Sequence, residues 1–194
     1  NSRNLAIKIS SMIDNNEDRA FFSRMIPNYA FSMKEHLRGK VIIEELELTD
    51  TEKAEIEHVE HKPNFVAHSL YKKLHEIKKE KRISEEEFLS IDNNLKTLSD
   101  IIGACERIRN TPIPYSYSLF LKKFIFLYVI TLPLGFVSSF GYYTPAISIF
   151  IFYVLVSMEV LAEEIEDPFG KDANDLPTGD LSKKIRANVQ EILR

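Results

Sequence analysis

The chain has 194 residues, with 25 Lys and Arg against 29 Asp and Glu, and its formal net charge at pH 7 is −4. A mildly acidic chain lacks the excess of positive charge on which nucleic-acid binding depends, so we expect no nucleic-acid partner. A single cysteine, Cys105, excludes both a disulfide framework within the chain and a zinc site made of several cysteines.

The first predicted helix lies in the charged N-terminal half of the chain. Apolar residues of 19–37 recur at helical spacing, and we expect Pro27 to kink or split this helix and Gly39 to end it. The segment 44–61 then has eight acidic residues against one lysine. Such a charge run is typical of a solvated loop with a short helix.

Two more helices are predicted before residue 110. One begins near Phe65, and Ser84 and Glu87 have the spacing of a capping box that starts the other. The apolar stripe of this long helix consists of Phe88, Ile91, Leu95, Leu98, Ile102, Cys105 and Ile108. We expect Cys105 to be a packed thiol and the basic stretch 72–82 to be a solvated helix face. No strand alternation occurs, so the predicted fold class is all-α.

Signals for enzymatic chemistry are absent from the sequence. The stretch 57–61 contains two histidines and two glutamates, but it lacks the His-x-x-x-His spacing that places two imidazoles on one helical face. No glycine-rich phosphate loop and no Ser-His-Asp arrangement can be assembled. We therefore expect the protein not to be an enzyme.

A long block without charge distinguishes the second half of the chain. Residues 124–158 contain no Asp, Glu, Lys, Arg or His. As one helix they would extend about 52 Å, well beyond a hydrocarbon core of about 30 Å. Gly141 and Pro145 interrupt the block, so we predict a helical hairpin with spans at 119–140 and 143–161. The alternative is a hairpin buried in a soluble core.

The charges beside the hairpin predict its orientation. Lys122 and Lys123 lie at the start of the first span, and the positive-inside rule places that side in the cytoplasm. A hairpin returns to the same side, which makes both polar parts cytoplasmic. We expect a multi-pass protein of the cell membrane with a cytoplasmic helical region at 1–114, a transmembrane hairpin at 115–166, and a cytoplasmic acidic turn and C-terminal helix at 167–194.

The entry to the hairpin contains an unusual turn. Pro112 and Pro114 remove two backbone donors and prevent a helix, so Ile113 is held on a stiff extended segment. In an ordinary protein this segment would be a linker. In an oligomeric pore it would present one apolar side chain from each subunit as a narrow collar.

The exit from the hairpin is strongly acidic. Carboxylates crowd the end of the return helix, where the helix dipole already favours cations, and more oxygens follow on a turn. The carboxylates are Glu159, Glu163, Glu164, Glu166, Asp167, Asp172 and Asp175. Oxygen ligands gathered on a turn are suited to Ca²⁺, although the spacing is not that of an EF-hand. The alternative is an acidic cap that pairs with Arg or Lys of a neighbouring helix or subunit.

These two motifs resemble the bacterial branch of the bestrophin family. The resemblance rests on the turn at 107–117 and on Glu-Asp-Pro-Phe-Gly-x-Asp-x-Asn-Asp-Leu-Pro at 166–177, with smaller landmarks at 1–3 and 34–39. It implies a homopentameric ion channel with an axial pore in the lipid bilayer. Animal members conduct chloride under control of Ca²⁺, and some bacterial relatives favour monovalent cations, so chloride and sodium both remain candidates.

The resemblance also implies roles for particular residues. Ile113 would form the hydrophobic cytoplasmic aperture, and Asp167, Asp172 and Asp175 match positions of the animal calcium clasp. Glu164 falls where that clasp has an amide, so calcium is a candidate ligand and no cofactor is required. The family has two earlier membrane helices, one of which lines the pore neck. We therefore expect the chain to be the C-terminal two-thirds of a subunit.

Two other functions are consistent with the residues. A membrane-anchored metal-dependent enzyme would use the carboxylates of 163–175 and lose its activity on Asp172→Ala without any ion flux. A non-conducting membrane assembly module would form stable oligomers that pass no current.

Overall fold

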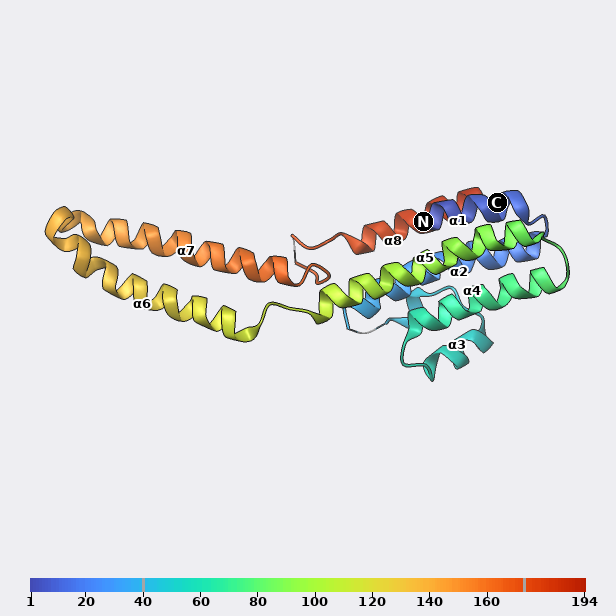
Figure 1. Cartoon of the computed structure of the whole chain (residues 1–194), viewed down its shortest axis with the longest axis horizontal. Coiled ribbons are helices and arrows are strands. Elements are labelled where there is room, and N and C mark those ends of the chain that lie inside the picture. The colour runs from blue at the N-terminus through green and yellow to red at the C-terminus, as the bar shows by residue number, and fades with distance from the viewer. Residues whose placement is uncertain (40, 173) are drawn as a thin grey trace. The chain divides into compact units, whose positions relative to one another are not determined.

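The computed structural model describes residues 1–39, 41–172 and 174–194, and every regular element in these ranges is a helix (Figure 1). The all-α prediction is therefore confirmed. The chain divides into two compact parts. We call Asn1–Ile108 with Pro177–Arg194 the helical unit and Arg109–Leu176 the hairpin unit.

The helical unit is assembled from both ends of the chain. Its helices are α1 (Ser2–Met12), α2 (Asn16–Leu37), the 3₁₀ turn η1 (Ile43–Glu45), α3 (Asp50–Glu57), α4 (Lys62–Lys79), α5 (Glu85–Asn110, whose last residues enter the hairpin unit) and α8 (Thr178–Ile192). Helix α2 packs against α1, α4 and α8. The largest fully buried side chains of the unit are Leu5, Ile9, Phe22, Met25, Ile26, Ile56, Val66, Leu70, Leu74, Ile77, Ile91 and Val189.

Helix α2 runs through Pro27 without a break. Asn15 caps its start, because the Asn15 side chain accepts hydrogen bonds from the backbone N–H groups of Glu17 and Asp18. Gly39 follows its end with a φ of 102°, a conformation that glycine adopts without a Cβ penalty. The alternative that Pro27 splits the helix is wrong, since the buried face on both sides of the proline packs as one surface.

The acidic segment 44–61 is less solvated than predicted. It forms η1 and α3, but Leu46 and Ile56 are buried in the core. The guanidinium of Arg24 donates two hydrogen bonds to the Glu52 carboxylate, at 2.5 and 3.0 Å, and so ties α3 to α2. The charge run is therefore one face of an amphipathic segment.

The capping box of α5 is confirmed. The Glu87 N–H donates to the Ser84 hydroxyl at 3.2 Å, and the Ser84 N–H donates to the Glu87 carboxylate at 2.8 Å. The predicted apolar stripe is buried only as far as Ile102, because Cys105 is half-buried and Ile108 is exposed. Burial, followed by the nearby Glu106 charge, raises the pKa of the Cys105 thiol, so the reactive thiolate is disfavoured.

The two terminal helices complete the helical unit. Helix α1 was not among the predicted elements, yet its Leu5 and Ile9 are fully buried. Helix α8 packs on α1 and α2 and buries Val189. The Arg186 guanidinium also donates to the Glu45 carbonyl at 3.0 Å, a contact across 141 residues of sequence.

Asp18 is a buried charge with two cationic partners. Its side chain is almost fully buried, Lys73 Nζ lies 2.7 Å from Oδ1, and Arg82 contacts Oδ2. Burial acts to raise the pKa of Asp18, but hydrogen bonds and charges from Arg82 and Lys73 outweigh it and hold the pKa below its usual value. Part of the basic stretch 72–82 thus neutralises Asp18 and is not simply a solvated face.

The hairpin unit has a different character. It consists of α6 (Tyr115–Phe140), the 3₁₀ turn η2 (Gly141–Tyr143) and α7 (Thr144–Glu166), and α6 and α7 lie side by side (Figure 1). The segment Tyr115–Glu166 is long and apolar enough to cross a membrane, with a mean hydropathy of 2.0 in its most apolar window, and none of that window is buried. The hairpin is therefore not the buried core of this chain.

Candidate functional site

The turn at Ile113 joins α5 to α6. The two prolines leave it without a regular helix, and the Tyr117 N–H donates to the Pro114 carbonyl at 2.8 Å, which starts α6 directly after the second proline. The Ile113 side chain is 42% exposed. An apolar side chain is thus presented to the exterior on a stiff backbone.

Ile113 borders a small cavity whose other walls come from both helices of the hairpin. The cavity has a volume of about 40 Å³. It is lined by Ile113, Tyr117, Ser118 and Leu121 at the start of α6 and by Glu159, Ala162, Glu163 and Glu166 at the end of α7. The structure therefore brings the predicted aperture residue beside carboxylates that lie more than forty positions away in sequence.

Lys122 neutralises part of this acidic group. Its Nζ lies 3.2 Å from Glu159 Oε1 and 2.5 Å from Glu163 Oε1. The lysine comes from α6 and the two carboxylates from α7. The acidic-cap alternative predicts that the carboxylates pair with Lys or Arg of a neighbouring helix. Glu159 and Glu163 do so, because both pair with Lys122 of α6.

The acidic turn after α7 is organised by its own polar groups. The Asp172 N–H donates to Asp175 Oδ2 at 2.6 Å, and the Asn174 side-chain amide donates to Glu164 Oε2 at 2.6 Å. A Cβ at Gly170 would lie 2.6 Å from Asp175 Oδ2, so a side chain at that position would displace this carboxylate. Asp167 and Asp172 are exposed.

The four candidate calcium residues do not converge on one point in this arrangement. Within the ranges that the structure describes, one group of three ligand side chains has its ligand atoms within 4.8 Å of one another, and it lies elsewhere. A calcium site at Glu164, Asp167, Asp172 and Asp175 stays a prediction.

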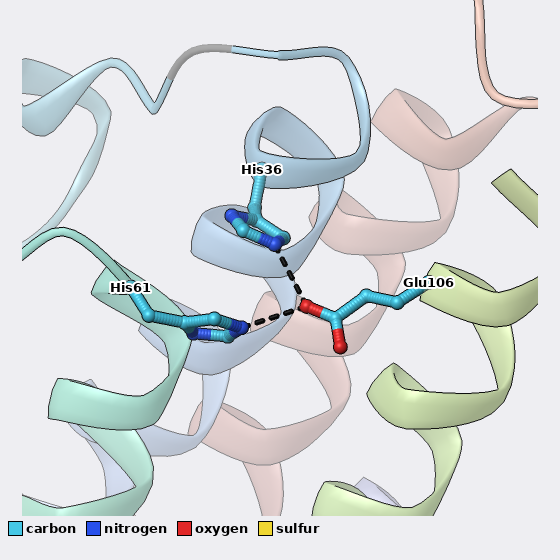
Figure 2. Close-up of side chains that lie close together, drawn as sticks. All are labelled: His36, His61 and Glu106. Carbon is cyan, nitrogen blue, oxygen red and sulfur yellow. Dashed lines mark hydrogen bonds and ion pairs between the residues drawn. The ribbon is translucent and has the colours of Figure 1, made fainter. Parts of the chain in front are cut away.

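The group of three ligand side chains consists of His36, His61 and Glu106 (Figure 2). Glu106 Oε1 lies 2.8 Å from His36 Nε2 and 2.7 Å from His61 Nε2. The sequence pattern associates His61 only with its neighbours in 57–61, whereas its partners lie on other helices. No spacing within one helix could have revealed this group, because each member comes from a different element.

The carboxylate of this group remains ionised at neutral pH. Burial acts to raise the pKa of Glu106, but the hydrogen bonds of His61 and His36 outweigh it and leave the pKa below its usual value. The group therefore combines one negative charge with two imidazole rings.

Curated relatives share long stretches of this sequence. The voltage-dependent anion channel-forming protein YneE of Salmonella typhi is 39% identical over 111 residues, which are 57% of this chain and 36% of that protein. The voltage-dependent anion channel-forming protein alr2987 of Nostoc sp. is 31% identical over 99% of this chain and 65% of its own length. The chain thus spans about a third of the first relative and just under two-thirds of the second.

Solved structures are similar over nearly the whole chain. A crystal structure of a bacterial bestrophin homologue from Klebsiella pneumoniae, determined on a point variant, is 28% identical with a TM-score of 0.94, covering 99% of this chain and 73% of its own. A crystal structure of a membrane protein, also a point variant, is 27% identical with a TM-score of 0.94, covering 99% and 72%.

A family model describes both the polar part and the apolar part of this sequence. The model of the bacterial and fungal bestrophin protein matches residues 1–191, from α1 to α8. The resemblance inferred from the turn at 107–117 and the motif at 166–177 is confirmed over the full range of the match. The chain belongs to the bacterial and fungal bestrophin family.

Proposed function

We propose that the chain is part of an ion-channel subunit that passes small monovalent ions, chloride or sodium, through an axial pore. The names of the curated relatives support channel formation. The observation that carries the proposal for this chain is Ile113, an exposed apolar side chain on a proline-stiffened turn at the start of an apolar hairpin.

The proposed topology follows from the hairpin unit. Helices α6 and α7 each have the length needed to cross a hydrocarbon core of about 30 Å, and most of their large apolar side chains are exposed. In the proposed arrangement these helices cross the membrane, and the helical unit and the acidic turn lie in the cytoplasm. Five copies around one axis, the number implied by the family resemblance, would enclose the pore.

In such an assembly the Ile113 side chains form a ring. Ion flow through a narrow apolar ring depends on its radius and its wetting, so the size of this side chain limits conductance. The carboxylates that line the cavity with Ile113 attract cations, whereas the positive charge of Lys122 repels cations. The sign of the conducted ion therefore depends on the balance between Lys122 and these carboxylates, which an electrical measurement determines.

The experiment is a planar-bilayer recording under a NaCl gradient. We would record the 194-residue chain, and a chimera in which the chain replaces the matching region of the Klebsiella homologue, so that the rest of that subunit is present. We expect a current whose reversal potential departs from zero, with its sign identifying the ion. Ile113→Ala in the chimera should change conductance or selectivity, and Ile108→Ala, an exposed isoleucine before the turn, should not.

Three outcomes would contradict parts of the proposal. An unchanged current in Ile113→Ala would remove the aperture role. A verified oligomer of the chimera without current under any salt would favour an assembly module. Bound divalent metal together with a chemical activity that is lost in Asp172→Ala, again without current, would favour an enzyme.

A calcium site on the acidic turn is a further part of the proposal. The turn already orders two carboxylates, since Asp175 accepts from the Asp172 backbone and Glu164 accepts from Asn174. A hard cation bound there would draw on Glu164, Asp167, Asp172 and Asp175 as oxygen ligands.

A further inference from the structure

We propose that His36, His61 and Glu106 form a binding site for a divalent transition-metal ion, with Zn²⁺ as the expected occupant. Each side chain supplies one ligand atom, and these atoms lie within 4.8 Å of one another. This inference does not depend on ion conduction, because all three residues lie in the helical unit.

The distances suit a tetrahedral ion after a small expansion. Both Nε2 atoms lie within 2.8 Å of Glu106 Oε1, and the imidazole centroids are 4.3 Å apart (Figure 2). Zinc binds histidine nitrogen and carboxylate oxygen at about 2.0–2.2 Å, which places tetrahedral ligands about 3.3 Å apart. The carboxylate therefore has to withdraw by roughly half an ångström from each ring, a shift that its own side-chain torsions allow.

Three helix ends hold the ligands in place. His36 lies in the last turn of α2, His61 caps the start of α4, and Glu106 lies near the end of α5. Their side chains are 24%, 29% and 28% exposed, respectively. The ligands are thus supported by packing, while the site stays open for an ion to enter and for water to occupy a fourth position.

Metal binding through Nε2 requires a change in the hydrogen bonds of His61. The Asn64 N–H donates to His61 Nδ1 at 3.2 Å, so in this arrangement the hydrogen of the neutral ring lies on Nε2 and points at Glu106. A metal at Nε2 requires the ring hydrogen to lie on Nδ1, where it would face the Asn64 N–H, so the ring has to turn and the Asn64 N–H loses this side-chain acceptor. The Asn64 N–H keeps a partner in the His61 carbonyl at 3.1 Å, so the start of α4 stays hydrogen-bonded.

The donor set selects the kind of metal. Two imidazoles and one carboxylate suit zinc and neighbouring transition metals, whereas Ca²⁺ and Mg²⁺ require shells made of oxygen. The Glu106 carboxylate lies against both imidazoles, where its charge would offset part of the metal charge. A bound ion would link α2, α4 and α5 and would stabilise the helical unit by mass action.

The test is a zinc titration of the 194-residue chain in detergent, followed by calorimetry and by the thermal midpoint of unfolding. We expect one Zn²⁺ per chain and a higher midpoint. His36→Asn, His61→Asn and Glu106→Gln should each weaken binding by more than the roughly 10- to 100-fold that loss of an outer-sphere partner costs. The controls are His68→Asn, which changes an exposed histidine on α4, and the double variant Asp172→Asn with Asp175→Asn, and both should bind as the parent does.

A spectroscopic measurement on the parent protein avoids dependence on variants that fail to fold. Co²⁺ bound by two nitrogens and one oxygen should give visible absorption bands of tetrahedral coordination, and added Zn²⁺ should abolish them. The proposal is overturned if the parent binds no stoichiometric Zn²⁺ or if the cobalt spectrum stays that of the hydrated ion. It is also overturned if the variants at His36, His61 and Glu106 fold and bind Zn²⁺ as tightly as the parent. Equal loss of binding in either control would also overturn it.

Discussion

The helical unit and the hairpin unit differ in how far their apolar side chains are buried. In the helical unit Leu74 and its neighbours are fully buried, and the buried charge of Asp18 has two cationic partners. In the hairpin unit Leu134 is 77% exposed, and the described residues of α6 and α7 that are buried are Leu132, Thr144 and Ser148.

This difference indicates what stabilises the helical unit and what stabilises the hairpin unit. The helical unit buries apolar surface within the chain, as a water-soluble domain does. The hairpin unit has hydrogen-bonded helices but few buried side chains, so the environment of its apolar surface lies outside the chain. A lipid bilayer is the environment expected for the apolar hairpin of a membrane protein family.

The largest expected effect comes from opening a cavity in the helical unit. Leu74→Ala should lower the free energy of unfolding by about 3 kcal/mol, because the removed methyl groups leave a fully buried site. Leu134→Ala on the exposed hairpin surface should change it by less than about 0.5 kcal/mol in detergent. Chemical unfolding of both variants measures the contrast, and similar losses would show that the detergent-solubilised hairpin has a core of its own.

The second effect concerns the buried charge of Asp18. Asp18→Asn should lower the free energy of unfolding by about 2 kcal/mol at pH 7, because Lys73 and Arg82 lose a charged acceptor. The folded-state pKa of Asp18 is lowered, so its contribution is present above the unfolded-state pKa and is lost as the pH falls through the folded value. The difference in the free energy of unfolding between the parent and Asp18→Asn should therefore become smaller below about pH 4.

The control for this measurement is Asp14→Asn, which changes a fully exposed carboxylate 3.9 Å from Arg19. Its effect on stability should be small at every pH. The assigned direction of the Asp18 pKa would be contradicted if the difference in the free energy of unfolding between Asp18→Asn and the parent stayed constant down to about pH 3. That pH is well below the usual aspartate pKa.

The third effect should alter ion flow more than stability. Lys122→Met leaves Glu159 and Glu163 uncompensated beside Ile113, so the reversal potential of the chimera should shift toward cation selectivity. Because Lys122 is half-exposed, the thermal midpoint should fall by less than in Asp18→Asn. Lys123→Met is the matched control, and an equal shift there would indicate a general effect of net charge.

The smallest expected effect is that of calcium on the acidic turn. Ca²⁺ should raise the thermal midpoint of the parent slightly, and Asp172→Asn with Asp175→Asn should abolish that rise. An unchanged midpoint in the parent would leave this turn as an acidic cap of α7, ordered by Asp175 and Asn174 without an ion.

Local patterns in the sequence predicted those features that depend on neighbouring residues. Ser84 and Glu87 specify a capping box by themselves, and Gly141 divides an uncharged block into two helices, so both were predictable. The burial of Leu5 and Ile9 depends on packing against α2 and α8, and helix α1 was therefore missed.

Contacts between distant residues could not be predicted from spacing. His36 and Glu106 are 70 positions apart, and the cavity beside Ile113 joins the two ends of the hairpin. The alternative in which Pro27 splits its helix failed for a related reason, since burial of Met25, Ile26 and Tyr29 outweighs the local cost of the proline.

The position of α8 has a consequence for the order of synthesis. Helix α8 packs on α1 and α2, and the Ser182 hydroxyl lies 3.4 Å from the carbonyl oxygen of Ala30, 152 residues earlier. A ribosome translating this chain makes α6 and α7 before it makes α8, so helices α1 to α5 expose the apolar surface that α8 later covers until the hairpin unit has been made. Closure of the helical unit is thereby delayed until the hairpin unit has been made, and chaperone protection in that interval is most needed at the surface that α8 later covers.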